Sequence, residues 1–147
     1  MFRGRYDHTI DLKGRVSIPV KFREVLKEIY DERLIITNLD GCLVAYPYDE
    51  WLTIEKKVSS MSMVRKDVKS FKRFFISAAT ECSIDKQGRV LIPPTLREYA
   101  KLEKDIIFVG MTKMIEIWRK ENWEEEITLA EANLEGMDDE ALAELGL

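Results

Sequence analysis

The stretch DHTIDLKGRVSIPVKFREVL at residues 7–26 occurs a second time, in altered form, as ECSIDKQGRVLIPPTLREYA at residues 81–100. At an offset of 74 positions, nine of the twenty residues are identical, and both copies contain the string I-D-x-x-G-R-V-x-I-P. A weaker match at an offset of 72 relates residues 34–51 to residues 106–123 and ends on a tryptophan in each copy. Self-similarity of this length indicates that the chain contains two copies of one structural unit.

Both copies predict the same order of elements. In the first copy, residues 5–12 have the pattern of a strand, and an Asp-x-x-Gly sequence then predicts a tight turn that leads into a return strand at 16–18. A proline follows and predicts the first turn of a helix that ends near Tyr30. A hairpin of strands 34–38 and 42–46 completes the unit, with an Asp-Gly turn between them. The second copy predicts strands at 80–85, 90–92, 106–110 and 114–118 and a helix that ends near Lys101.

The repeat divides the chain into four parts. Unit 1 spans residues 5–51 and unit 2 spans residues 79–123, with a helical connector at 52–78 and an acidic C-terminal helix at 124–147. A unit of about 45 residues buries too little surface to be stable by itself. We therefore expect the two units to pack together around one shared core, related by an internal pseudo-twofold axis.

The composition argues against most enzyme classes. The 147 residues include one histidine and two cysteines 40 positions apart, and the strings HExxH, GxSxG and GxxxxGK[ST] are absent. No apolar run approaches the roughly 20 residues that span a bilayer. A hydrolase that pairs Asp11 with Asp85 is conceivable, but each aspartate stands in its own Asp-x-x-Gly turn. We expect no catalytic activity, no cofactor, no metal, no small-molecule substrate and a cytoplasmic location.

The net charge of −4 hides an uneven distribution. Residues 121–147 carry ten of the 27 acidic residues and no Lys or Arg, which leaves residues 1–120 with 23 basic residues against 17 acidic ones. Because local patches determine the field that a partner meets, the overall acidity does not argue against a polyanionic partner.

The doubled motif resembles a known family. MFRG at residues 1–4, the two D-x-x-G-R-[VL]-x-[IV]-P strings and P-x-x-x-W at residues 47–51 are similar to MraZ proteins, over residues 1–123. The halves of MraZ proteins resemble the AbrB/SpoVT swapped-hairpin DNA-binding domain. The resemblance implies an α+β fold, in which a duplicated swapped-hairpin β-barrel core carries flanking helices.

The resemblance also implies a function. It is that of a bacterial transcriptional regulator of the division and cell-wall gene cluster, associated with the nucleoid. MraZ proteins form ring-like oligomers and bind short direct repeats of double-stranded DNA upstream of their own operon. The sequence does not indicate whether the regulator represses or activates, or how large the ring is.

Six basic residues are candidates for contacts with DNA. Arg15 follows the first turn, where a guanidinium could bond guanine O6 and N7, although an ion pair with Asp11 is the structural alternative. The equivalent Arg89 and the adjacent Lys86 are weaker candidates, because Gln87 and Thr95 replace Lys13 and Lys21 in the second copy. Phosphate contacts are expected of Arg3, Arg5 and Lys13.

A protein-interaction or scaffold module is the alternative function. In that case the acidic C-terminal helix, and not the turns, would hold the partner. Deletion of residues 124–147 distinguishes the two functions, because it would abolish partner binding but leave DNA binding largely intact.

Overall fold

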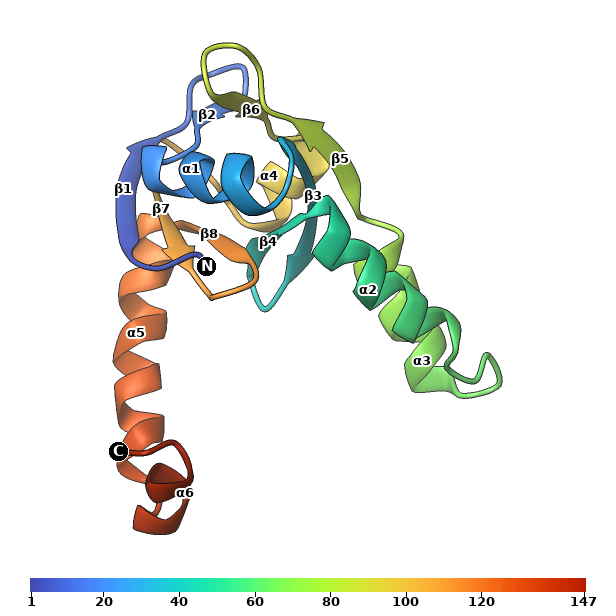
Figure 1. The fold of residues 1–147 in the computed structure, drawn as a ribbon, viewed down its shortest axis with the longest axis vertical. Coiled ribbons are helices and arrows are strands. Elements are labelled where there is room, and N and C mark those ends of the chain that lie inside the picture. Colours follow the sequence, from blue (N-terminus) through green and yellow to red (C-terminus); the bar gives the residue numbers. More distant parts are fainter.

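The computed structural model describes all of residues 1–147 and shows the same order of elements in both halves (Figure 1). The first half contains β1 (Arg5–Thr9), β2 (Arg15–Ser17), α1 (Val20–Ile29), β3 (Arg33–Leu39), β4 (Cys42–Pro47) and α2 (Tyr48–Ser59). The short helix α3 (Lys66–Phe71) and the π-helical turn η1 (Lys72–Ile76) follow. The second half contains β5 (Thr80–Ser83), β6 (Arg89–Leu91), α4 (Pro94–Tyr99), β7 (Asp105–Gly110), β8 (Ile115–Arg119), α5 (Lys120–Glu135) and α6 (Asp139–Glu144).

The two halves exchange strands. Six strands form one sheet in the order β1-β7-β8-β4-β3-β5, and β2 and β6 form a separate two-stranded ribbon. The first strand of each half thus pairs with the third strand of the other half, as β1 with β7 and β5 with β3, all antiparallel. The fold is α+β, and the hydrogen-bonded order is linear, with β1 and β5 at its two ends.

An internal pseudo-twofold axis follows from the pairing registers. If every strand is exchanged for its counterpart in the other half, the strand order of the sheet is the same order read from the opposite end. In the ribbon, Val16 lies opposite its own counterpart Val90. In the sheet, Val44 lies opposite Glu116, which is its counterpart at the offset of 72. The axis therefore passes through the centre of both layers.

The expected first hairpin is partly wrong. We expected residues 5–12 to turn back directly onto 16–18, but β1 ends at Thr9 and meets the return strand in a single bridge, between Ile10 and Val16. Backbone groups next to β2 that do not pair with β1 form hydrogen bonds with the other half instead. The Ile18 N–H, for example, donates to the Gly88 carbonyl at 2.9 Å. The second hairpin is confirmed, because Asp40 and Gly41 adopt φ of 53° and 81°, the positive values that a type I′ turn requires.

Residues of both halves share one core. Alternate residues of the sheet, such as Leu34, Leu43, Ile106 and Ile117, pack with the inner side of the ribbon and with α1 and α4 in a cluster of 19 buried side chains. The opposite face of the sheet packs against α2, η1 and α5 through a smaller cluster that includes Trp118. Helices cover both faces, so successive residues of the central strands are buried.

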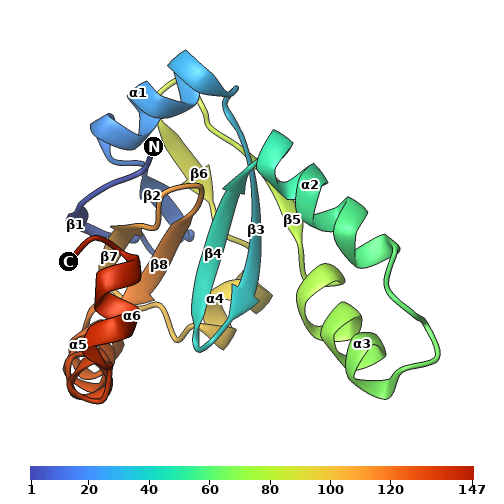
Figure 2. The same ribbon diagram turned by 60° about the horizontal axis from the view of Figure 1, so that its bottom comes forward.

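The helical parts differ in detail from the expectation. We expected a helical connector at 52–78, but α2 ends at Ser59 and α3 begins only at Lys66, and Val64 in the loop between them is exposed. The α2–α3 segment projects from one end of the sheet, and α5 leaves the other end (Figure 2). No helix combines the length and apolar character that a membrane span needs.

We predict that neither half folds alone, because the partners of β1, β2 and β5 lie across the pseudo-twofold axis. A chain of residues 1–78 should be unfolded as a monomer, and mixing it with residues 79–147 should restore the native far-ultraviolet circular dichroism and a cooperative thermal transition. A folded, monomeric 1–78 fragment would contradict the strand exchange.

Candidate nucleic-acid interface

The β2–β6 ribbon has one buried and one exposed face. Val16 and Val90 point into the core and are almost fully buried. Because side chains alternate along a strand, the residues on either side of them point outward. Those residues form the outer face of the ribbon, namely Arg15, Ser17, Arg89 and Leu91. The exchange of strands thus places the two arginines on one surface as diagonal neighbours, which in a sheet lie roughly 7–8 Å apart and somewhat less at their Cβ atoms.

An aspartate closes each turn before the ribbon. The Asp11 Oδ1 accepts hydrogen bonds from the backbone N–H of Lys13 at 2.9 Å and of Arg15 at 2.8 Å. Asp85 accepts equivalent bonds from Gln87 and Arg89. These backbone donors are the main reason why the pKa of both carboxyls lies below its usual value. Each carboxylate is therefore ionised and occupied by its own turn, which leaves the hydrolase alternative without support.

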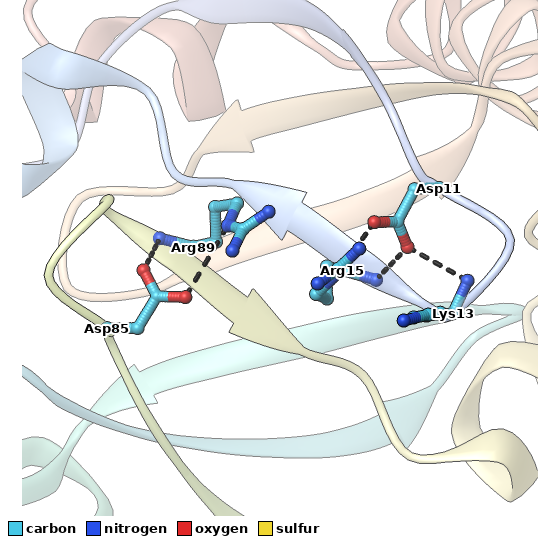
Figure 3. A network of polar contacts seen from close by, with 5 residues as sticks. All are labelled: Asp11, Lys13, Arg15, Asp85 and Arg89. Atoms are coloured by element: carbon cyan, nitrogen blue, oxygen red, sulfur yellow. Dashed lines mark hydrogen bonds and ion pairs between the residues drawn. The ribbon is translucent and has the colours of Figure 1, made fainter.

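The same aspartates hold the arginines (Figure 3). Arg15 Nε donates to Asp11 Oδ2 at 2.7 Å, so the ion pair considered from the sequence is present. The two Nη groups of Arg15 make no hydrogen bond within the chain and remain available to a ligand. In the second unit, Arg89 Nε lies 3.4 Å from Asp85 Oδ2, and this contact lacks hydrogen-bond geometry. Arg15 is thus more firmly oriented than Arg89.

An arginine of the opposite unit supports each turn. The guanidinium of Arg97, on α4, covers Gly14, where an added Cβ would lie 2.6 Å from its Cζ. Arg97 is itself fixed by a 3.0 Å hydrogen bond from its Nε to the Ile92 carbonyl. Arg23, on α1, covers Gly88 in the same way. In the sequence, Arg23 and Arg97 stand out only because the two copies share an Arg at this position, and that repeated Arg is the signal for this role.

The six candidate residues do not form one cluster. The turns before β2 and β6 lie at one end of the molecule (Figure 1). Lys13 and Lys86 belong to these turns and are exposed. Arg5 lies at the far end of β1, roughly 15–20 Å from the turn, with its guanidinium 5.1 Å from the ring centre of Trp123. Arg3 lies beside Gly110 in the β7–β8 region. Arg3 and Arg5 therefore lie away from the turn that carries Arg15, and their expected phosphate contacts stay a prediction.

The ribbon presents further exposed residues that the sequence did not single out. Leu12 is fully exposed at the tip of the first turn, and Leu91 is exposed on the outer face beside Ser17. Leu12 could be recognised only as an apolar residue in an otherwise polar turn. Ser17 and Leu91 could be found only once the pairing of β2 with β6 was known, because that pairing decides which residues share a face.

The two cysteines and the one histidine do not gather into a site. Cys42 and Cys82 are buried and unpaired, and burial raises the pKa of both thiols, that of Cys82 to about 11. His8 packs edge-on against Phe108 with ring centres 5.4 Å apart, and desolvation lowers its pKa. No group of three or more His, Cys, Asp or Glu residues is arranged to hold a metal ion.

Strand exchange about a pseudo-twofold axis, with an arginine-bearing ribbon on the outside, defines a duplicated swapped-hairpin protein of the AbrB-like class. Residues 1–74 and 75–144 each match the family described as "MraZ protein, putative antitoxin-like". The chain belongs to the MraZ family.

Several relatives carry the name Transcriptional regulator MraZ. The protein of Caldanaerobacter subterraneus subsp. tengcongensis is 53% identical over 125 residues, which cover 85% of each chain. That of Desulforamulus reducens is 48% identical over 136 residues, 92% of this chain and 93% of its own. That of Lactiplantibacillus plantarum is 44% identical over 137 residues, 93% and 95% of the two chains. These proteins are named as regulators and not as enzymes.

We predict that Gly14→Ala destabilises the protein more than Gly41→Ala. Both glycines have positive φ, 88° and 81°, where a Cβ costs about 1–2 kcal/mol. Only at Gly14 would the Cβ also meet the Arg97 guanidinium, whereas nothing lies within 4 Å at Gly41. Chemical denaturation of the two variants, alone and with Arg97→Ala, measures the difference. Equal losses of stability in the wild-type background would contradict the contact.

Proposed function

We propose that the chain is a sequence-specific DNA-binding transcriptional regulator without catalytic activity, which reads the major groove with the outer face of the β2–β6 ribbon. The observation that carries this proposal is the pair Arg15 and Arg89, which lie partly exposed on the outer face of a two-stranded ribbon. The major groove of B-DNA accepts a ribbon of that size. The name shared by the relatives, Transcriptional regulator MraZ, supports the same function.

Arg15 is the principal base-reading residue in this proposal. Its Nε is held by Asp11, so the plane of the guanidinium is fixed before DNA arrives, and its free Nη groups can donate to guanine O6 and N7. Arg89 reads with less precision, because its ion pair with Asp85 is longer. Pre-orientation matters because less side-chain entropy is lost on binding.

Phosphate contacts would come from the turns. Lys13 and Lys86 flank the ribbon, are exposed and make no ion pair within the chain, so they can approach the backbone on either side of the groove. Arg3 and Arg5 take no part in the groove contact that we propose, because they lie at the other end of β1. The two units therefore contribute unequally, with Leu12 and Lys13 in the first turn and Lys86 and Gln87 in the second.

The biological target that we propose is the one that the family resemblance implies. The regulator would act in the cytoplasm, at the nucleoid, on the division and cell-wall gene cluster, and bind direct repeats upstream of its own operon. A homo-oligomer, in the form of a ring, would engage several repeats together. Linked contacts of this kind can exceed a single affinity by about 10²–10⁴-fold.

The acidic helix favours a second candidate function, that of a protein-interaction module. No residue of α5 is buried, and Leu129 and Leu134 are exposed among its acids. Deletion of residues 124–147 separates the two functions. DNA binding that persists at a single repeat after the deletion supports the ribbon as the reading surface.

We predict that DNA from upstream of the chain's own gene binds more tightly than a scrambled duplex, and that Arg15→Ala removes most of this preference. A bidentate contact to guanine contributes roughly 1–3 kcal/mol, about 5–150-fold in affinity. Lys13→Ala should weaken binding to both duplexes equally and flatten the salt dependence by about one unit. Fluorescence anisotropy in about 150 mM salt measures all three effects.

Arg5→Ala is the matched control, because it removes the same positive charge at the far end of β1. It should leave the preference for the upstream duplex unchanged. Equal binding of both duplexes by the wild-type chain would overturn the proposed function, and an unaltered preference in Arg15→Ala would overturn the role of Arg15.

A further inference from the structure

A groove between α5 and the sheet is open to solvent. Its volume is about 520 Å³, and five apolar side chains form its floor and walls, namely Met111, Trp118, Trp123, Ile127 and Ala130. Three acidic residues line it as well, Asp40, Glu116 and Glu126. We call this set of residues the α5 groove.

The pseudo-twofold axis gives the α5 groove a counterpart that is filled. The counterparts of Trp118 and Trp123 are Tyr46 and Trp51, at the offset of 72. Between those two rings lies Phe75, which is 2% exposed, with its ring centre 5.4 Å from that of Trp51 and 6.4 Å from that of Tyr46. In the first unit, a phenylalanine from η1 therefore occupies the position that is empty in the second.

The chain supplies no such residue to the second unit. After α2, the chain folds back through α3 and η1 to cover the sheet, whereas after α5 it continues to the short helix α6, at the far end of α5 (Figure 1). No residue of α5 or α6 is buried. Whatever covers the α5 groove must come from outside this copy of the chain.

The acids of the α5 groove have no cation partner within the chain. Asp40, Glu116 and Glu126 make no ion pair, and the Glu116 carboxylate is half-buried and bonded only to Trp118 Nε1, at 3.1 Å. Burial raises the pKa of Glu116, and the neighbouring carboxylates Asp40 and Glu126 raise it further. An occupant that carries basic residues would relieve this crowding of like charges.

The segment 61–76, which we call the α3 arm, has the complementary properties. Phe71 and Phe74 are 37% and 42% exposed, and Met63 and Val64 are exposed on the preceding loop. Four basic residues accompany them without any ion pair within the chain, namely Lys66, Lys69, Lys72 and Arg73. The same segment already supplies Phe75 to the counterpart groove, so its local sequence suits a site of this shape.

We propose that the α5 groove binds the α3 arm of a second copy of this chain, with Phe71 and Phe74 entering the apolar floor and the basic residues facing Asp40, Glu116 and Glu126. The groove lies beside α5 and the arm contains α3, and these two helices lie on opposite sides of the molecule (Figure 2), so the groove and the arm are different surfaces. The contact is therefore head-to-tail, and successive copies add in one direction until a ring closes. This inference rests on the oligomer in the proposed function and specifies its interface.

Charge reversal on each surface tests the proposal in the full-length chain. The groove variant is Glu126→Lys/Ala130→Lys, and the arm variant is Lys69→Glu/Lys72→Glu/Arg73→Glu. Both sets are surface positions, and circular dichroism verifies that each variant folds. The matched control is Glu131→Lys/Glu135→Lys, which changes the charge of α5 outside the groove.

Sedimentation velocity at micromolar concentration should show a multi-copy wild type and control, and monomers for the groove and arm variants. An equimolar mixture of the two variants should regain the wild-type mass, because each altered groove then meets an oppositely charged arm. A monomeric wild type, or variants that keep the wild-type mass, would overturn the proposal. A mixture that stays monomeric would overturn the pairing of these two surfaces.

The same variants separate this inference from the proposed function. If both hold, the monomeric variants bind a duplex with one repeat as well as the wild type does, but bind a duplex of several repeats at least ~100-fold more weakly. If the wild type assembles as expected but shows no preference for its upstream DNA, the interface stands and the proposed function fails.

Discussion

The antiparallel pairing of β2 with β6 is the contact on which the remaining structure depends. These two short strands come from different halves of the chain. Each turn also accepts a backbone hydrogen bond from the other half, from the Ile18 N–H to the Gly88 carbonyl and from the Ile92 N–H to the Gly14 carbonyl. The pairing buries Val16 and Val90 and, by alternation, places the partly exposed Arg15 and Arg89 on the other face. The exchange that forms the core thus also forms the candidate DNA-reading surface.

The scaffold is nearly symmetric, whereas the chemistry that it carries is not. The turns share their aspartate, their glycine and a covering arginine from the opposite unit, so their backbones are alike. Lys13 of the first turn is replaced by Gln87 in the second, and of the two ribbon arginines only Arg15 has a hydrogen-bonded ion pair with the aspartate of its turn. The helices that end the two units diverge as well, because η1 fills the groove beside α2 and nothing within the chain fills the one beside α5.

Much of the fold could be predicted from the sequence, because the repeat is strong and its turns have distinctive residues. The Asp-x-x-Gly turns, the Asp40–Gly41 hairpin and the helices after Pro19 and Pro93 all depend on local geometry, which local sequence determines. The pairing partners of the strands do not depend on local sequence alone. An alternating pattern indicates that one face of a strand is buried, but it does not indicate which strand lies beside it.

The residues of the candidate site also differ in whether local sequence indicates them. The sequence points to Arg15 and Lys13 as candidates because they belong to the turn motif itself. Arg3 and Arg5 are close to the turn in sequence, but β1 is extended and carries them away from it, so that Arg5 lies on Trp123. The supporting role of Arg97 and the exposure of Leu91 arise across the pseudo-twofold axis, where no local pattern records them.

The central claim is that Arg15, held by Asp11, reads a guanine in the major groove. A double-mutant cycle tests it most directly. The affinities of the wild-type and Arg15→Ala chains are measured for an operator duplex in which single guanines are replaced, one at a time, by 7-deazaguanine. The account predicts one guanine whose replacement weakens wild-type binding by roughly 1–3 kcal/mol and leaves Arg15→Ala unaffected. Losses that are the same for both chains at every guanine would contradict it.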